Sequence, residues 1–209
     1  MFGPPGAGKG TQSQNIASKF NLHQVSTGDL LRKEVENNTK IGKEIEKNIS
    51  KGNFASDDIV NELLQKLIKD NSYKNRIIFD GYPRNINQAE SLEKIIKTEN
   101  QSINHIFFLN VSREIIEKRI LGRVICQKCN VVLNNFYNKQ EVDDHPCGSQ
   151  YLFKRSDDNL ETIINRYDTY MKKTKPVLDF YKTKSEFHEI DASMKIDEIT
   201  AKIQEIIEV

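Results

Sequence analysis

A glycine-rich loop near the start of the chain constrains the fold more than any other feature. It reads Gly3-Pro-Pro-Gly-Ala-Gly-Lys9 and runs directly into a helical pattern that continues to about Phe20. Glycines at this spacing let backbone N–H groups turn inward around phosphate oxygens, and the lysine reaches the β and γ oxygens. The sequence therefore predicts a phosphate-binding loop at the N-terminus of a helix.

Short apolar runs alternate with helical patterns along most of the remaining chain. The runs at 76–80, 105–110 and 187–191 are typical of strands buried on both faces of a parallel sheet, and a short strand is expected at 24–26. Thr27 is the expected N-cap of the first helical pattern after that strand. The helical patterns cover 28–35, 40–49, 58–68, 86–96, 112–121, 160–181 and 196–207. This order predicts an α/β, doubly wound core.

Only the segment 122–156 breaks the alternation. It is rich in Asn, Gly, Tyr and Cys, and its short alternations at 131–133 and 151–153 predict small β-hairpins. Cys126-x2-Cys129 is followed, after fourteen residues, by Asp144-x2-Cys147, which is the spacing of a two-knuckle zinc site. Asp144 fits the spacing of the fourth ligand and the adjacent His145 competes for it, while free thiols are the alternative to a metal.

Composition narrows the class of partner. The net charge of +1 gives no basic field for nucleic acid or a membrane surface, so the expected partners are small molecules. An odd number of cysteines, three, without a secretion signal argues against a disulfide scaffold. The sequence contains no apolar run near the roughly 18 residues that a bilayer span needs, and a cytoplasmic monomer is expected.

Arginine use marks candidate phosphate ligands. Most of the 31 basic residues are lysines. A composition so biased toward lysine keeps arginine where its planar fork is needed, for example to bind phosphate through two hydrogen bonds. The arginines are Arg32, Arg76, Arg84, Arg113, Arg119, Arg123, Arg155 and Arg166.

Three motifs together resemble one enzyme family. Lys9 is followed by Gly10-Thr11 rather than by the Ser or Thr that usually binds magnesium, so the ion is expected to be held mostly by phosphates and water. This form of the loop resembles the nucleoside monophosphate kinases, in particular the adenylate kinase family. Ser26-Thr-Gly-Asp-Leu-Leu-Arg32 resembles the start of that family's acceptor-binding subdomain. Asp80-Gly-Tyr-Pro-Arg84 follows a buried strand, where ligands bind in open α/β sheets, and is similar to another family signature.

The resemblance extends over nearly the whole chain and implies a set of site residues. Thr27 would lie near the acceptor base, Gln88 would bind the adenine edge, and Asp80 would hold magnesium-bound waters. The implied ATP-binding residues are Gly6, Ala7, Gly8, Lys9, Gly10, Thr11, Arg119 and Arg123. The implied AMP-binding residues are Thr27, Arg32, Gly81, Arg84, Gln88, Arg155 and Arg166. The implied catalytic residues are Lys9, Arg84, Arg119, Arg123, Arg155 and Arg166.

It also implies an architecture and a reaction. The fold would be an α/β, P-loop, doubly wound parallel sheet with a helical NMP-binding insert at 26–55 and a small zinc-binding β lid at 122–158. The core would comprise 1–25, 56–121 and 159–209. Many lids of the family carry Cys where this chain has Asp144. The implied activity is reversible phosphoryl transfer from Mg-ATP to AMP, giving two ADP, with Mg²⁺ bound to ATP and a structural Zn²⁺ in the lid.

Two other functions remain open. A UMP/CMP-type kinase shares the loop and the Asp-Gly-x-Pro-Arg turn, although Gln88 and the long cysteine-bearing lid favour AMP. The chain could also be a non-catalytic nucleotide-binding protein or a zinc-knuckle nucleic-acid module that retains the loop. Its near-neutral charge and its clustered arginines argue against that class.

The segment before the loop departs from the usual pattern. A phosphate loop normally follows a buried strand, yet only Met1 and Phe2 precede Gly3 in this sequence. We expect either a start several residues upstream or a sheet without its central strand, whose neighbours would expose unpaired backbone groups. In the second case, poor stability and weak activity are expected.

Overall fold

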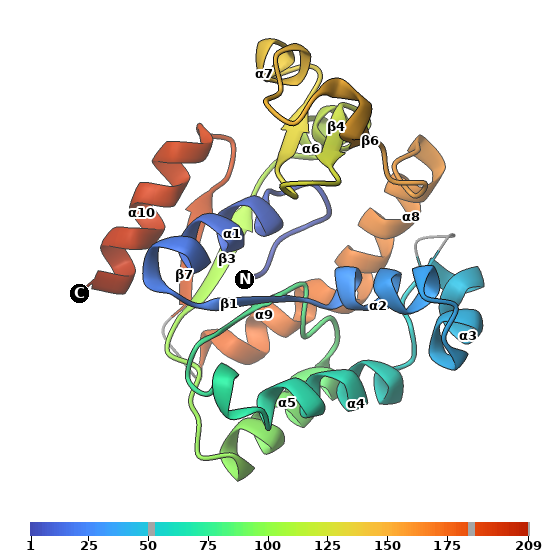
Figure 1. Ribbon diagram of the computed structural model, residues 1–209. Coiled ribbons are helices and arrows are strands. Elements are labelled where there is room, and N and C mark those ends of the chain that lie inside the picture. Colours follow the sequence, from blue (N-terminus) through green and yellow to red (C-terminus); the bar gives the residue numbers. More distant parts are fainter. Residues whose placement is uncertain (50–52, 184–186, 209) are drawn as a thin grey trace.

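Two pairs of parallel strands lie at the centre of the molecule in the computed structural model (Figure 1). β1 (His23–Ser26) pairs with β2 (Ile77–Asp80), and β3 (Ile106–Asn110) pairs with β7 (Phe187–Asp191). Met1 and Phe2 lie between the two pairs: the Met1 amino group donates to the Phe79 carbonyl oxygen at 3.0 Å, and Phe2 forms a parallel bridge with Phe108. The expected α/β class with parallel strands is confirmed.

The structure describes residues 1–49, 53–183 and 187–208. Residues 50–52 of the predicted unit 26–55, and 184–186 and 209 of the predicted unit 159–209, lie outside the described residues.

Helices lie on two sides of the strands. α1 (Lys9–Phe20) and α10 (Ile196–Glu208) pack against each other on one side, where Ile16 and Ile203 join Leu109 in an apolar cluster. α4 (Asp57–Ile68), α5 (Ile86–Thr98) and α9 (Lys175–Lys182) lie on the other side (Figure 1). The chain turns at the carboxyl ends of β2 and β3, and the candidate site lies at these turns.

A helical pair, α2 (Thr27–Glu36) and α3 (Lys40–Ile49), follows β1 and forms one edge of the molecule (Figure 1). The expected N-cap of α2 is wrong by one residue. The Ser26 hydroxyl oxygen accepts from the Asp29 backbone N–H at 3.2 Å, which satisfies a free donor of the first helical turn. Thr27 instead donates its hydroxyl to the Gly81 carbonyl oxygen at 3.0 Å and so ties α2 to the turn after β2.

A small antiparallel sheet stands apart from the core (Figure 1). Helix α6 (Arg113–Leu121) leads into it from β3, and its strands are β4 (Arg123–Cys126), β5 (Val132–Asn134) and β6 (Leu152–Phe153). The strand order is β5-β4-β6, as expected for short hairpins. A short helix, α7 (Lys139–Asp143), lies between β5 and β6 and was not expected from the sequence.

The helix expected at 160–181 is divided. α8 (Leu160–Thr169) and α9 are separated by a π-helical turn, η3 (Tyr170–Thr174). Two short 3₁₀ turns, η1 (Asn71–Tyr73) and η2 (Ser149–Tyr151), complete the elements of the described residues. No helix in the described part of the chain is both long and apolar enough to pass through a membrane.

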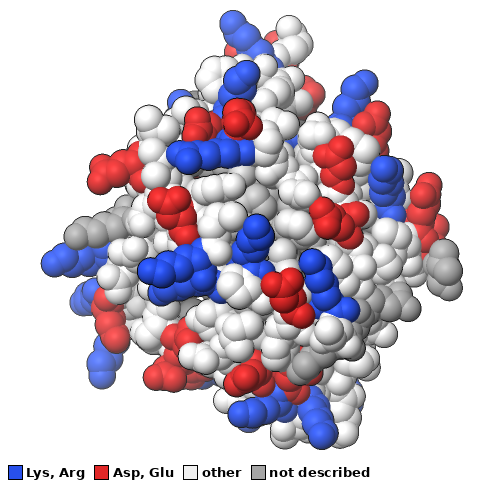
Figure 2. Space-filling view, turned by 180° about the vertical axis from the view of Figure 1, so that it is seen from behind, with Lys and Arg blue, Asp and Glu red and all other residues white. Residues whose placement is uncertain are grey.

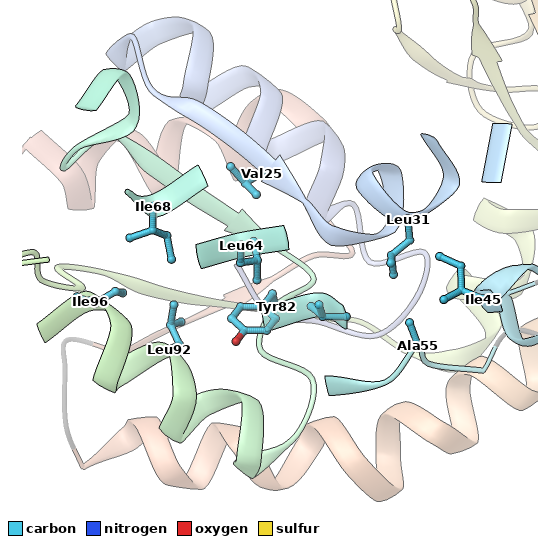
Figure 3. Close-up of a cluster of buried hydrophobic side chains, with 10 residues drawn as sticks. Val25, Leu31, Ile45, Ala55, Leu64, Ile68, Tyr82, Leu92 and Ile96 are labelled. Carbon is cyan, nitrogen blue, oxygen red and sulfur yellow. The ribbon is translucent and has the colours of Figure 1, made fainter. Parts of the chain in front are cut away.

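A cluster of buried side chains holds α2, α3, α4 and α5 to β1 (Figure 3). Its fully buried members include Leu64, which is 0% exposed, and Leu92, which is 1% exposed. Charged side chains lie on the surface instead, and Lys and Arg are interspersed with Asp and Glu over the face seen in Figure 2. Burial of apolar groups therefore provides the main free energy that joins the α2–α3 pair to the core.

Leu64→Ala should lower the free energy of unfolding by about 2–5 kcal/mol, because it leaves a cavity in this cluster. Gln65→Ala, at an exposed position one residue further along α4, is the control and should change it by less than about 0.5 kcal/mol. Urea unfolding followed by circular dichroism measures both. Equal stabilities of the two variants would contradict this account of the cluster.

Candidate active site

The glycine-rich loop connects Phe2 to α1 and curves back on itself. Gly6 has φ of 78° and Gly8, the N-cap of α1, has φ of 96°, a region that favours glycine. A Cβ at Gly6 would lie 2.9 Å from Cγ1 of Ile120 on α6, so the loop also needs glycine for close packing. The Lys9 ammonium bridges the loop by donating to the carbonyl oxygens of Gly3 at 2.9 Å and Pro4 at 3.0 Å.

Lys9 lies in a region of concentrated positive charge. Its pKa is lowered from 10.5 to about 8: desolvation by the surrounding protein has the largest effect, Arg84, Arg166 and Arg123 add to it, and Asp80 opposes it. The three arginines come from the turn after β2, from α8 and from β4. Segments far apart in the sequence thus place their cations around one loop, as expected for a site that binds several phosphate groups.

Asp80 ends β2 close to this lysine and is only 7% exposed. Its carboxylate accepts a hydrogen bond from the Gln24 side chain at 3.0 Å, and the same Gln24 amide lies 3.3 Å from the carbonyl oxygen of Gly10. Asp80 is therefore held between β1 and the first turn of α1. It faces the loop from the carboxyl edge of the strands.

Arg84 is fixed from three directions. Its Nε donates to the Gly81 carbonyl oxygen at 2.7 Å, its guanidinium carbon lies 4.9 Å from the centre of the Phe54 ring, and its own carbonyl oxygen accepts from the Thr174 hydroxyl at 2.8 Å. Desolvation lowers the pKa of Arg84, and Arg32 acts in the same direction, while Asp80 opposes the shift. Arg84 also lines a cavity together with Lys9, Gly81 and Arg166.

Carboxylates pair with the other predicted phosphate ligands. Asp29 on α2 contacts both Arg32 and Arg155, the latter at 3.2 Å. Burial works against ionisation of Asp29, but the two arginines outweigh it and hold the pKa of Asp29 below its usual value. Asp29 thus connects the helical pair to the segment that leaves the small sheet.

The two carboxylates after Arg155 continue this pattern. Asp157 accepts from Arg166 at 2.8 Å, and Asp158 accepts from the Arg123 Nε at 2.8 Å. Burial lowers the pKa of Arg155 and of Arg166 to about 10 each. Asp29, Asp157 and Asp158 were not among the predicted site residues, although their positions beside predicted arginines in the sequence were a usable signal.

Arg119 lies at the end of α6 beside the loop, where its guanidinium is 3.4 Å from the carbonyl oxygen of Ala7. Burial lowers its pKa, as it does for the arginines of the site. Gln88 lies in the first turn of α5, is 2% exposed and shares hydrogen bonds with Arg84 and Asp57. The structure therefore brings Arg84, Arg119, Arg123 and Arg166 together with Lys9 and Asp80 at the loop, and it places Gln88 next to Arg84. Arg32 and Arg155 meet at Asp29. Two candidate arginines lie elsewhere: Arg76 donates to the Asn21 carbonyl oxygen, and Arg113 pairs with Glu117 on its own helix.

A second cluster lies in the small sheet. Cys126, Cys129, His145 and Cys147 have their ligand atoms within 4.8 Å of one another. The structure places His145 in this group instead of Asp144, which was the expected fourth member. The reason is local: Asp144 is the C-cap of α7, and its carboxylate pairs with the Gln140 side chain on the same helix. Three sulfurs and one imidazole are the donor set that structural zinc sites use.

Comparisons with known proteins identify the family. The family model described as adenylate kinase matches residues 1–186. The adenylate kinase of Pelagibacter ubique (strain HTCC1062) is 58% identical over 209 residues, which is 100% of this chain and 98% of that protein. The adenylate kinase of Caldanaerobacter subterraneus subsp. tengcongensis is 37% identical over 98% of this chain and 93% of its own length.

The adenylate kinase of Listeria innocua serovar 6a is 34% identical over 99% of this chain and 97% of that protein. These relatives carry one name, and each match covers at least 98% of this chain. The chain belongs to the adenylate kinase family.

Proposed function

We propose that the chain transfers the γ-phosphoryl group of Mg-ATP to the phosphate of AMP and, in reverse, converts two ADP to ATP and AMP. The observation that supports this most strongly is the concentration of Lys9, Arg84, Arg123 and Arg166 around the glycine-rich loop. The acceptor phosphate is an anion at neutral pH, so the reaction needs no general base. Catalysis then depends on in-line positioning and on neutralisation of charge that develops on the transferred group.

The two nucleotides are assigned to two sides of this charged region. ATP is assigned to the loop, with Gly6, Ala7, Gly8, Gly10 and Thr11 contacting phosphates through backbone groups and Lys9, Arg119 and Arg123 through side chains. AMP is assigned to the side formed by α2 and the β2–α5 turn, with Thr27, Arg32, Gly81, Arg84 and Gln88. Arg155 and Arg166 are also assigned to AMP, and they would act on the transferred group as well. Asp80 would orient waters bound to the Mg²⁺ that accompanies ATP.

The inserted segments are assigned to substrate closure. The unit 26–55 carries Arg32 and Asp29, and the unit 122–158 carries Arg123 and Arg155. Closure of both over the core would exclude water, which would otherwise accept the phosphoryl group. A cytoplasmic location, a monomeric state and a lack of nucleic-acid and membrane partners stay predictions of the sequence.

A structural Zn²⁺ is proposed in the small sheet, held by Cys126, Cys129, Cys147 and His145. The fit rests on the donor set and on its spacing, including the 3.5 Å between the Cys129 sulfur and the His145 Nε2. A sheet of short strands buries little apolar surface, so a metal crosslink between its two turns would supply rigidity. The ion would have no part in the chemical step.

Lys9→Met and Arg84→Met should each lower kcat by a factor of about 100 or more, because each removes a charge that faces the transferred phosphoryl group. Lys94→Met, at an exposed position on α5, is the matched control and should leave kcat unchanged. A coupled assay of ADP formation measures the rates, and thermal melting checks that the variants fold. A kcat near the wild-type value in either site variant would refute the assignment.

Phosphate binding should take up a proton at mildly alkaline pH. Lys9 has its pKa lowered to about 8 in the free protein, and bound phosphates favour the charged form and raise it again. ATP affinity should therefore fall as the pH rises above about 8, and binding at about pH 8.5 should take up protons. Calorimetry in two buffers of different ionisation enthalpy measures the uptake. Undiminished uptake in Lys9→Met would show that another group titrates.

His145→Asn should reduce the zinc content of the purified protein, whereas Asp144→Asn should leave it near one ion per chain, because His145, and not Asp144, lies with the three cysteines. Elemental analysis measures the content. Chelation should loosen the small sheet and leave the parallel core folded, which hydrogen exchange would report. Loss of zinc only on changing Asp144 would overturn the ligand assignment.

A further inference from the structure

The side-chain amide of Gln88 is held by partners that cannot exchange roles. Its Oε1 accepts from the backbone N–H of Arg84 at 2.8 Å, and its Nε2 donates to Oδ1 of Asp57 at 2.7 Å. A backbone N–H can only donate and an ionised carboxylate can only accept. Rotating the amide by half a turn would place oxygen against oxygen at Asp57 and N–H against N–H at Arg84. The orientation of Gln88 is therefore set before any nucleotide binds.

Asp57 is itself held in place by a second amide. Asn85 donates its side-chain N–H to the same Oδ1 of Asp57 at 2.8 Å, and its side-chain oxygen accepts from the backbone N–H of Gln88 at 2.8 Å. Asn85 is the N-cap of α5, and Asp57 lies in the first turn of α4. Two helix starts thus fix one carboxylate beside Gln88, which is only 2% exposed.

The fixed amide still has one donor and one acceptor to offer. A glutamine amide has two N–H donors and two oxygen lone pairs, and the contacts to Arg84 and Asp57 use one of each. Adenine presents an amino donor next to a ring-nitrogen acceptor, whereas a 6-oxopurine presents an oxygen acceptor next to a ring N–H donor. An amide that could flip would pair with either edge. An amide that cannot flip pairs with one of them.

We propose that Asp57 is a positioning residue that makes the acceptor site select 6-aminopurine over 6-oxopurine monophosphates, by holding the Gln88 amide in one orientation. The proposal rests on the proposed role of Gln88 as the residue that binds the base. A purely structural role for the same contacts is the competing explanation, because they resemble a capping arrangement at the start of α5. The two explanations differ in what they predict for base selectivity.

The test compares AMP with IMP, because IMP replaces the amino group by an oxygen and leaves ribose and phosphate unchanged. Asp57→Asn replaces the partner that can only accept by one that can donate or accept, so only the contact to the Arg84 N–H still opposes the rotated amide and the rotated form becomes accessible. The ratio of kcat/KM for IMP to that for AMP should rise about tenfold or more, with the KM for ATP unchanged. Asp58→Asn, which removes the same charge from the same helical turn at an exposed position, is the control and should keep the wild-type ratio.

Gln88→Leu separates failure of this proposal from failure of the proposed function. If Gln88→Leu leaves the IMP/AMP ratio unchanged, Gln88 does not bind the base and its assigned role is wrong. If Gln88→Leu changes the ratio and Asp57→Asn does not, only the positioning role of Asp57 is overturned.

A double variant tests the coupling directly. Adding Asp57→Asn to Gln88→Leu should change the ratio no further, whereas an Asp57 that acts through the fold would lower both rates equally in both backgrounds. Thermal melting of each variant checks folding. If Asp57→Asn does not fold, Asp57→Ser removes the same fixed acceptor and carries the same prediction. A wild-type ratio in the folded serine variant would overturn the proposal.

Discussion

Repulsion between cations around the glycine-rich loop is the constraint that the rest of the structure must meet. Desolvation has the largest effect on the lowered pKa of Lys9, but Arg84, Arg166 and Arg123 lower it as well, so these charges oppose one another. The structure offsets the repulsion with carboxylates: Asp157 pairs with Arg166, Asp158 pairs with Arg123, and Asp80 lies near Lys9. The phosphates of two nucleotides would supply the same negative charge. The carboxylates therefore balance part of the positive charge around the loop.

The fold brings these charges together from distant parts of the chain. The turns after β2 and after Phe2 lie at one edge of the strands, and α6 and α8 carry Arg119 and Arg166 toward the same edge. Asp29 links α2 to Arg155 and so joins the helical pair to the segment that leaves the small sheet. This contact holds α2 close to the segment that follows β6.

Much of this could be predicted from the sequence, because the informative signals were local. The loop, the strand at 187–191 and the helix of α3 at Lys40–Ile49 follow from spacing and apolar pattern alone, and the structure has them there. Two predictions named the wrong one of two adjacent residues. Ser26 caps α2 in place of Thr27 because Thr27 has a distant partner in Gly81, and His145 replaces Asp144 because α7 retains Asp144.

The carboxylates that pair with the arginines were also missing from the predicted site, for a different reason. Each of the three carboxylates concerned is close in sequence to a predicted arginine, but Asp29 contacts Arg155 and Asp158 contacts Arg123 across the fold. Such partners depend on how α2, β4 and the start of α8 are arranged in space. A search of the sequence for phosphate ligands finds the cations and overlooks the anions that hold them.

The π-helical turn between α8 and α9 changes the angular phase of one long helix. A wide turn of this kind accommodates an extra residue, and each residue of an α-helix advances the side chain by about 100°. Arg166 before the turn faces Asp157 and the loop, while Val177 and Tyr181 after it lie in the apolar cluster with Phe2. Thr174, inside the turn, reaches the carbonyl oxygen of Arg84. The helical segment from α8 to α9 can in this way present a charged side chain to the nucleotide site and an apolar face to the core. The change of face lies in the π-helical turn, where Thr174 contacts Arg84.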